Sequence, residues 1–127
     1  LSYLTHAFIK KEAIRFGFDD ALQITASGFI TESSSANFFM VKNNSLLTPH
    51  LGDGLLPGIT RQRIIEYCHM NGIRCIEKQI HHSEILEADD VFLCNALMGV
   101  INVSMIEDRI FSSSPLTLLL KKRMETA

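Results

Sequence analysis

Apolar residues in the first part of the chain follow a helical period and then a strand period. A stripe at helical spacing runs through residues 1–16, which predicts an amphipathic helix that Gly17 ends. Residues 21–25 alternate as a strand, residues 26–28 have the composition of a turn, and residues 29–31 return as a second strand. The pattern therefore predicts a helix followed by a hairpin.

The next segment has the pattern of another strand pair. Residues 37–41 form a strongly apolar strand, residues 43–44 a turn, and residues 46–48 a short strand that Pro49 ends. The composition then shifts to Gly, Asp and Pro over residues 50–57, which predicts a loop.

Helical spacing returns after this loop. The stripe over residues 59–68 predicts a helix that the Asn-Gly pair at residues 71–72 closes. Residues 73–80 alternate as a strand. Ser83 is expected to cap a short helix that runs through Ala88.

The last third predicts two more strands and a final helix. Residues 90–94 form an apolar run typical of a buried strand, and residues 100–106 form another. Ser114 and Pro115 provide a cap and a first-position proline for a last helix. Many short strands, a few helices, early hairpins and later crossovers together predict one sheet-based domain of the mixed α+β or α/β class.

Composition narrows the range of functions. The 127 residues are enough for one domain with a real core, and 46% hydrophobic against 20% charged residues excludes a disordered tail. The net charge of −2 gives no basic field for nucleic acid. The basic run at residues 121–123 lies at the end of a predicted helix, where it complements the helix dipole. We therefore expect a small-molecule substrate and no nucleic-acid partner.

The number and spacing of the cysteines and histidines match neither a metal site nor a disulfide framework. The three cysteines are odd in number and not closely paired, which favours a reducing compartment over a disulfide framework. His81 and His82 are adjacent, so in a strand they would point to opposite faces and could not bind one metal ion together. No zinc-ligand spacing, membrane-spanning run or signal peptide is visible, and the expected location is the cytoplasm.

The start of the helix after residue 58 is the first candidate for binding chemistry. The leading N–H groups of a helix lack internal partners, and the helix dipole places partial positive charge there. Gly58 leaves room for an approaching phosphate, while Ile59 and Thr60 can offer backbone donors and a hydroxyl. An ordinary helix that follows a loop and binds nothing would show the same pattern.

Two further segments add to this candidate. Glu32 follows an apolar strand and precedes three serines, so its carboxylate is expected where the strand leaves the sheet. A carboxylate beside a pyridine nitrogen keeps that nitrogen protonated, although a solvated acid at a hairpin edge is the alternative. Residues 95–99 form a polar, small-residue turn after a buried strand, which can aim N–H groups at a ligand or simply connect two strands. Together the three segments match the outline of pyridoxal 5′-phosphate.

These residues also resemble a known family. The runs at residues 17–22, 31–33, 37–39, 48–49 and 56–61 are similar, and in the same order, to those of the fold type IV pyridoxal-phosphate enzymes. That family includes branched-chain and D-amino acid aminotransferases and 4-amino-4-deoxychorismate lyase. The resemblance implies its larger C-terminal domain, a twisted, barrel-like sheet core with flanking helices.

The resemblance also implies a set of cofactor-binding residues. They are Glu32, Leu56, Gly58, Ile59, Thr60, Asn95 and Ala96. In this correspondence Glu32 pairs with the pyridine nitrogen and Leu56 packs on the ring. The other positions hold the phosphate, at the helix start and at a second turn.

The second turn separates the subfamilies. Aminotransferases usually have a Gly-Thr or Ser-Thr pair there, whereas Asn95 and Ala96 are similar to the aminodeoxychorismate lyase version. The resemblance therefore implies a homodimeric enzyme that eliminates pyruvate from 4-amino-4-deoxychorismate to give 4-aminobenzoate, a folate precursor. The alternatives are a branched-chain or D-amino acid aminotransferase of the same fold, or a binding domain without catalysis.

The family's Schiff-base lysine has no counterpart in the printed sequence. The resemblance places it just upstream of Leu1, while Lys10 and Lys11 lie away from the matched position. We therefore expect residues 1–127 to be the C-terminal cofactor-binding domain of a longer enzyme, lacking the N-terminal domain and the lysine. The chain by itself is expected to be inactive.

Overall fold

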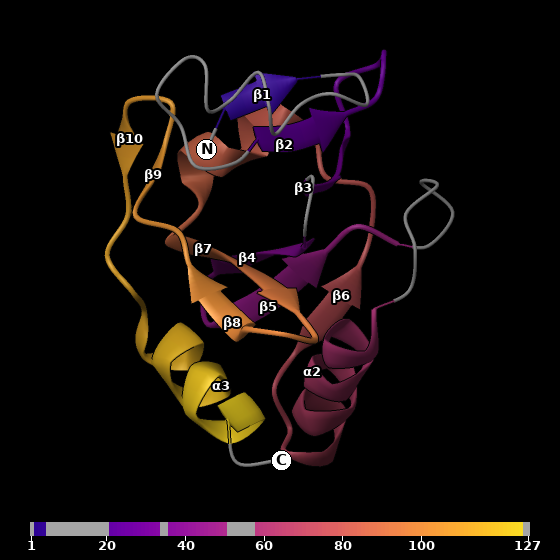
Figure 1. Ribbon diagram of the computed structural model, residues 1–127, viewed down its shortest axis with the longest axis vertical. Coiled ribbons are helices and arrows are strands. Elements are labelled where there is room, and N and C mark those ends of the chain that lie inside the picture. Colours follow the sequence, from indigo (N-terminus) through magenta and orange to yellow (C-terminus); the bar gives the residue numbers. More distant parts are fainter. Residues whose placement is uncertain (1, 5–20, 34–35, 51–57, 126–127) are drawn as a thin grey trace.

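A computed structural model describes residues 2–4, 21–33, 36–50 and 58–125 (Figure 1). Residues 51–57 of the loop expected over 50–57, and most of the expected first helix, lie outside these ranges. In chain order the elements are β1 (Ser2–Leu4), β2 (Ala21–Ile24), β3 (Ile30–Ser33), β4 (Asn37–Lys42), β5 (Ser45–Thr48), α2 (Ile59–Met70), β6 (Cys75–Glu77), the 3₁₀ helix η2 (His82–Glu87), β7 (Asp90–Asn95), β8 (Gly99–Asn102), β9 (Met105–Ile106), β10 (Arg109–Ile110) and α3 (Pro115–Glu125).

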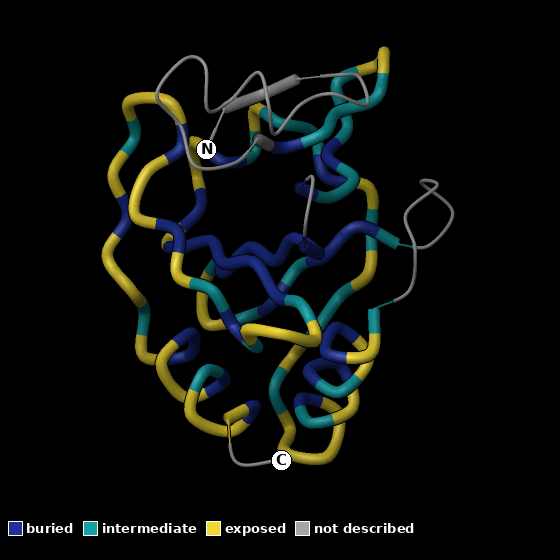
Figure 2. The backbone as a smooth tube through the Cα atoms, viewed as in Figure 1, coloured by how far each residue is buried: buried dark blue, intermediate teal, exposed yellow. Residues whose placement is uncertain are grey.

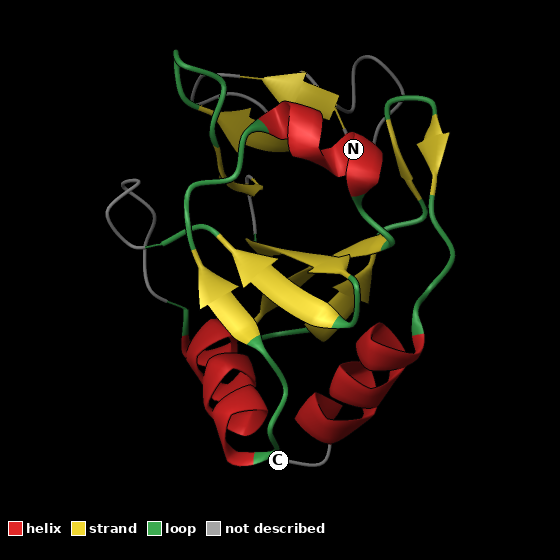
Figure 3. Cartoon of the chain, turned by 180° about the vertical axis from the view of Figure 1, so that it is seen from behind, coloured by secondary structure: helices red, strands yellow, loops and turns green. Residues whose placement is uncertain are grey.

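Most strands join in one mixed sheet. The order is β1-β2-β3-β4-β5-β6, with β7 between β4 and β8, while β9 and β10 form a separate pair. The β1–β2 and β5–β6 pairs are parallel, and the other pairs are antiparallel. Figures 1 and 3 show α2 and α3 below β4, β5, β7 and β8, with β1, β2 and η2 above. The expected mixed α/β class with a twisted sheet and flanking helices is confirmed, and within the described part the sheet does not close into a barrel.

The two central strands are buried on both faces (Figure 2). Phe38 and Met40 of β4 point into one apolar cluster, and Phe39 and Val41 point into the other. The first cluster also contains residues of β2, β3 and η2, and the second contains residues of α2 and α3. Because neighbouring residues of a strand face opposite sides, a strand between two cores is apolar throughout, as the sequence of β4 is.

Several predicted turns and caps are confirmed. Asn43 and Asn44 have φ angles of 50° and 62°, the left-handed pair that a tight hairpin requires. Helix α2 ends at Met70 with Asn71 as its C-cap, followed by Gly72 at φ 69°. Ser114 caps α3 by accepting a hydrogen bond from the Thr117 N–H at 3.1 Å.

Four other predictions need correction. Ser2–Leu4 is a strand rather than part of a helix, because it pairs with Ala21–Ile24. The strand expected over residues 73–80 is limited to Cys75–Glu77, where it pairs with β5. The strand expected over residues 100–106 is divided between β8 and β9.

The fourth correction concerns the short helix after β6. It is a 3₁₀ helix, and its N-cap is His81 rather than Ser83. The His81 Nδ1 accepts a hydrogen bond from the Ser83 N–H at 3.2 Å, and the Glu84 carboxylate accepts one from the His81 N–H at 2.8 Å. His82 is the first residue of η2, so the two adjacent histidines do not share a strand.

Candidate functional site

The first turn of α2 has unused backbone donors. Its N-cap, Gly58, is extended (φ −86°, ψ 146°), and no side chain caps the helix. The first main-chain bond of the helix runs from the Gln62 N–H to the Gly58 carbonyl at 3.0 Å. The N–H groups of Ile59, Thr60 and Arg61 therefore have no acceptor within the helix. The first turn also has no acidic residue, so an anion meets no repulsion from it.

The second predicted turn lies directly against this helix start. The Thr60 hydroxyl donates a hydrogen bond to the Asn95 carbonyl at 3.0 Å. The Asn95 Oδ1 accepts one from the Met98 N–H at 2.7 Å, which folds the turn between β7 and β8. Ala96 is exposed in that turn. The structure thus brings together the two segments that were predicted to contact one phosphate.

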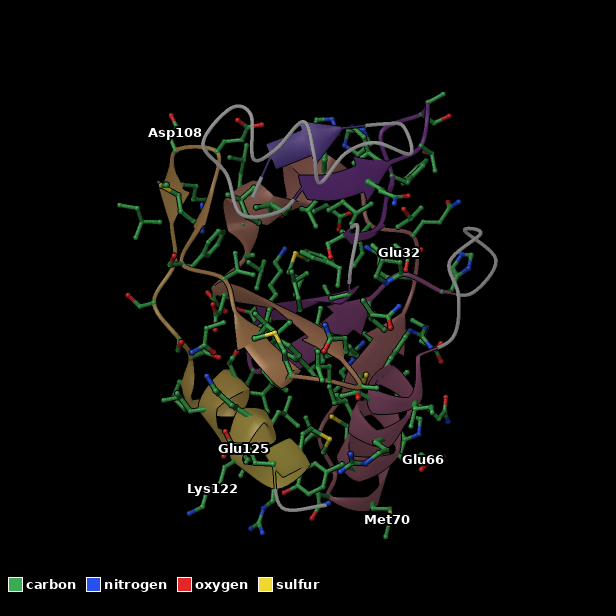
Figure 4. The ribbon with its side chains drawn as sticks, viewed as in Figure 1. Glu32, Glu66, Met70, Asp108, Lys122 and Glu125 are labelled. Carbon is green, nitrogen blue, oxygen red and sulfur yellow. The ribbon has the colours of Figure 1, made fainter. Side chains whose placement is uncertain are left out.

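Glu32 is connected to the same place through β4. It pairs with Asn37 between β3 and β4, and Asn37 pairs with Cys94 between β4 and β7. The Asn37 side chain also lies against the N-cap of α2, because a Cβ added at Gly58 would clash with its Oδ1. Figure 4 shows Glu32 where β3 ends. Asn37 therefore lies beside Glu32 in the sheet and against the helix start.

The Glu32 carboxylate is half-buried, and no described residue supplies it with a counter-charge. Burial raises its pKa above the ordinary value of 4.5. No other described residue forms a salt bridge or side-chain hydrogen bond with this carboxylate. A cation placed beside it, such as a protonated ring nitrogen, would offset the cost of burying the charge.

The raised pKa predicts a pH-dependent effect of Glu32→Gln on the cofactor-free protein. Well below pH 4.5 the carboxyl is protonated in both the folded and the unfolded states, so the two proteins should have similar stability. As the pH rises from 4.5 to the raised pKa of the folded state, the unfolded wild type ionises first and the wild type loses stability, while glutamine stays neutral. Thermal unfolding at several pH values should show Glu32→Gln gaining relative stability toward neutral pH. A constant difference across that range would contradict the burial of this carboxylate.

Arg61 anchors the helix start, and sequence reasoning assigned it no role. It is 1% exposed, and its Nη2 donates hydrogen bonds to the Pro49 carbonyl at 3.0 Å and to Glu77 Oε1 at 2.7 Å. Arg61 shares the buried face of α2 with Ile64 and Cys68. The signal that could have identified it is a charged residue on an apolar stripe, directly after the predicted phosphate-binding run.

Asn37 was also given no role beyond its strand. It is 7% exposed, and a buried amide in an otherwise apolar strand is the pattern that could have marked it. Of the other predicted positions, Leu56 lies outside the described residues. Ile59 is 74% exposed, so its side chain packs little, but its backbone N–H is available to a phosphate.

The described residues contain neither a candidate metal site nor a candidate membrane-spanning helix. No group of His, Cys, Asp or Glu side chains within them could hold a metal ion. None of the helices in the described ranges is long and apolar enough to cross a membrane.

The arrangement fits a phosphorylated aromatic cofactor with a basic ring nitrogen. One end offers uncapped N–H groups and a small N-cap residue, and the other offers a carboxylate with no counter-charge among the described residues. This is the combination that the sequence predicts for a pyridoxal-phosphate protein.

Comparison with known families identifies the chain within that class. The family described as Amino-transferase class IV matches residues 1–106, so the chain belongs to this family. Among curated relatives, the chain is 36% identical over 84% of its length to a Synechocystis protein named "probable branched-chain-amino-acid aminotransferase". It is 32% identical over its whole length to the D-alanine aminotransferase of Bacillus licheniformis.

Solved structures agree with the family. A Legionella pneumophila protein described as a "putative 4-amino-4-deoxychorismate lyase" superposes with a TM-score of 0.90 at 36% identity, over 94% of this chain and 45% of that one. An aminotransferase from Brucella abortus, bound to the cofactor PLP, superposes with a TM-score of 0.83 at 28% identity, over 93% of this chain and 41% of that one. Members of the family therefore bind pyridoxal phosphate.

The chain covers only part of these relatives. It spans 35% of the Synechocystis protein and 44% of the Bacillus licheniformis enzyme. The predicted family is confirmed, while the choice between lyase and aminotransferase within it stays a prediction.

Proposed function

We propose that this chain is the cofactor-binding part of a pyridoxal-phosphate enzyme that eliminates pyruvate from 4-amino-4-deoxychorismate and releases 4-aminobenzoate. The observation that carries the cofactor proposal is the hydrogen bond from Thr60 to Asn95, which holds the two predicted phosphate turns together. When bound, the cofactor supplies an electron-withdrawing pyridinium that stabilises negative charge on the substrate carbon during bond breaking.

The residues of this chain bind and orient the cofactor. The N–H groups of Ile59 and Thr60 would donate to the phosphate, and Gly58 leaves the approach free of a side chain. The Glu32 carboxylate would hold the proton on the ring nitrogen. The hydrogen bonds of Arg61 keep the helix start fixed relative to β6 and the chain at Pro49. A rigid phosphate end and a rigid ring-nitrogen end together set the orientation of the ring.

The second turn supports a lyase over an aminotransferase. Neither Asn95 nor Ala96 has a hydroxyl, whereas the aminotransferase pattern usually provides one at this point. The Thr60 hydroxyl already donates to the Asn95 carbonyl. The phosphate would therefore be held here mainly by backbone N–H groups. The likeness to the Legionella pneumophila protein supports the same choice.

The experiment that tests the lyase proposal is a direct assay of 4-aminobenzoate. The longer enzyme that contains residues 1–127, purified and loaded with pyridoxal phosphate, is incubated with 4-amino-4-deoxychorismate, and the product is followed by its fluorescence and by chromatography. We expect stoichiometric 4-aminobenzoate and pyruvate. No product above the uncatalysed rate, from protein that shows the absorbance of bound cofactor, would contradict the proposal.

An aminotransferase is the second candidate, and the names of the curated relatives favour it. It is tested on the same preparation with branched-chain amino acids or D-alanine as the amino donor and 2-oxoglutarate as the acceptor. Fast amino transfer together with slow 4-aminobenzoate release would select this candidate. The reverse ratio would select the lyase.

We further propose that residues 1–127 act as one domain of a longer, cytoplasmic, homodimeric enzyme whose lysine precedes Leu1. Lys42 lies at the opposite end of β4 from Asn37 and pairs with Glu87 at 2.9 Å, and Lys78 pairs with Glu84 at 3.0 Å. Protein limited to these 127 residues is therefore expected to release no 4-aminobenzoate. Turnover by this 127-residue protein, measured in parallel with a longer product of the same gene, would contradict the proposal that the reacting lysine precedes Leu1.

Gly58→Ala tests the phosphate end of the site. The added Cβ would clash with the Asn37 Oδ1, so the helix start must shift. Overpacking of this kind costs about 1–3 kcal/mol, and if this cost falls on the cofactor-binding conformation, cofactor affinity is expected to fall by about 5- to 150-fold. Ile59→Ala is the matched control, because it keeps the backbone N–H and changes an exposed side chain. Titration by visible absorbance should separate the two variants; equal affinities would contradict the role of Gly58.

A further inference from the structure

A hollow of about 480 Å³ opens between the end of α2 and the start of α3. Figure 3 shows the connection from α2 to β6 passing between the two helices. This connection, the β4–β5 turn and the beginning of α3 supply the lining, which includes Asn44, Ile73, Arg74, Pro115, Leu116 and Leu119. A volume of this size is in the range of small-molecule sites in proteins.

Most of the lining is apolar. Leu116 is 7% exposed and belongs to the cluster that α2 and α3 cover, and Ile73 packs against that cluster while remaining partly exposed. Leu119 is 36% exposed, and Pro115 beside it is also exposed. A ligand that covered Ile73 and Leu119 would therefore be favoured by the apolar surface that it removes from water.

Two polar side chains at the hollow have no partner among the described residues. Arg74 is exposed, and its guanidinium forms neither a salt bridge nor a side-chain hydrogen bond with them. Asn44 is exposed in the left-handed hairpin turn, and its amide is likewise unpaired with them. The lining contains no acidic residue, so the guanidinium makes it complementary to an anion.

We propose that this hollow binds a small apolar carboxylate. The hydrocarbon part of the ligand lies against Ile73 and Leu119, the carboxylate accepts hydrogen bonds from the Arg74 guanidinium, and the Asn44 amide can donate another. A compact molecule is the assigned occupant because three separate segments surround the volume and supply both an apolar wall and a cation.

The hollow is separate from the candidate cofactor site. It lies at the C-terminal end of α2, whereas the cofactor site lies at the helix start, and a helix of 12 residues is roughly 18 Å long. The inference therefore does not depend on the proposed function, and failure of the lyase assay would leave it standing.

The experiment is a titration of the longer enzyme that contains residues 1–127, loaded with cofactor, with 4-phenylbutyrate. Carbon-13 NMR of labelled isoleucine methyl groups follows binding, and Ile73→Val identifies the Ile73 signal. We expect a saturable shift of that signal, with the absorbance of the bound cofactor unchanged. The neutral analogue 4-phenylbutyramide has the same apolar part without the charge, and it should bind about 5-fold more weakly.

Two pairs of variants test the groups that line the hollow. Arg74→Gln should weaken 4-phenylbutyrate binding by about 5-fold and abolish the preference for the acid over the amide. Lys122→Gln removes an exposed charge of α3 outside the hollow and should change neither. Leu119→Glu places a carboxylate in the hollow and should weaken binding by at least about 10-fold, because like charges repel. Leu118→Glu, at a position that is 53% exposed and outside the lining, is its matched control.

Other outcomes would overturn the proposal. In the wild type these are equal binding of the acid and the amide, no saturable shift at Ile73, or a change in cofactor absorbance without that shift, which would place the probe at the cofactor site. A lower molar mass by light scattering for Leu119→Glu but not for Leu118→Glu would assign the hollow to a contact between copies of the chain. The wild-type titrations decide the question even if a variant folds poorly, which circular dichroism detects.

Discussion

Replacing Glu32 by glutamine is expected to lower the rate of 4-aminobenzoate release by about 100-fold or more, because a fixed charge aimed at the reacting system is lost. Glutamine keeps the size of the side chain but cannot hold a proton on the ring nitrogen. The phosphate end of the site is unchanged, so cofactor affinity should fall much less than turnover. Steady-state kinetics and an absorbance titration on one preparation measure the two effects separately.

The matched control for this variant is Glu66→Gln. Glu66 is exposed on α2, where its carboxylate accepts a hydrogen bond from Gln62 at 3.2 Å, and Figure 4 shows it on the outer side of the helix. The same chemical change at Glu66 should leave turnover within a factor of about 2 of wild type, since surface substitutions away from special features have small effects. Equal losses in the two variants would show that Glu32 has no special relation to the chemistry.

Much of the fold could be predicted from local patterns. The Asn43-Asn44 turn, the C-cap of α2 at Asn71 and the N-cap of α3 at Ser114 each depend on a few neighbouring residues. The errors arose in segments whose secondary structure depends on strands that are distant in the sequence. Ser2–Leu4 is a strand because it pairs with β2, and β6 is short because only three of its residues pair with β5. Helical spacing or alternation within a segment contains no information about such partners.

Prediction of the candidate site from the sequence was limited in the same way. A helix start, a strand-end acid and a small-residue turn could each be identified from the sequence, but each also had an ordinary structural explanation. Their proximity depends on Asn37, which pairs with Glu32 and contacts Gly58, and on the bond from Thr60 to Asn95. The buried anchor Arg61 was missed because a charged residue on a helix is usually exposed.

The strands that hold this site in place depend on a stacked aromatic pair. Phe39 of β4 and Phe92 of β7 are directly paired, with ring centroids 5.0 Å apart and an angle of 6° between the rings. Both rings are fully buried in the cluster that α2 and α3 cover. β4 begins with Asn37 and β7 ends with Asn95, so loosening this pair would disturb both ends of the candidate site.

Phe92→Ala is therefore expected to lower the free energy of unfolding by about 3–5 kcal/mol, the usual cost of deleting a buried aromatic ring and leaving a cavity. The loss of stacking accounts for roughly 0.5–1.5 kcal/mol of it. Urea denaturation measures the change. Ile110→Ala removes an apolar side chain that is 76% exposed and should alter stability by no more than about 0.5 kcal/mol. If Phe92→Ala were as mild as Ile110→Ala, the cluster between the sheet and α2 could not be what fixes the helix start against Asn95.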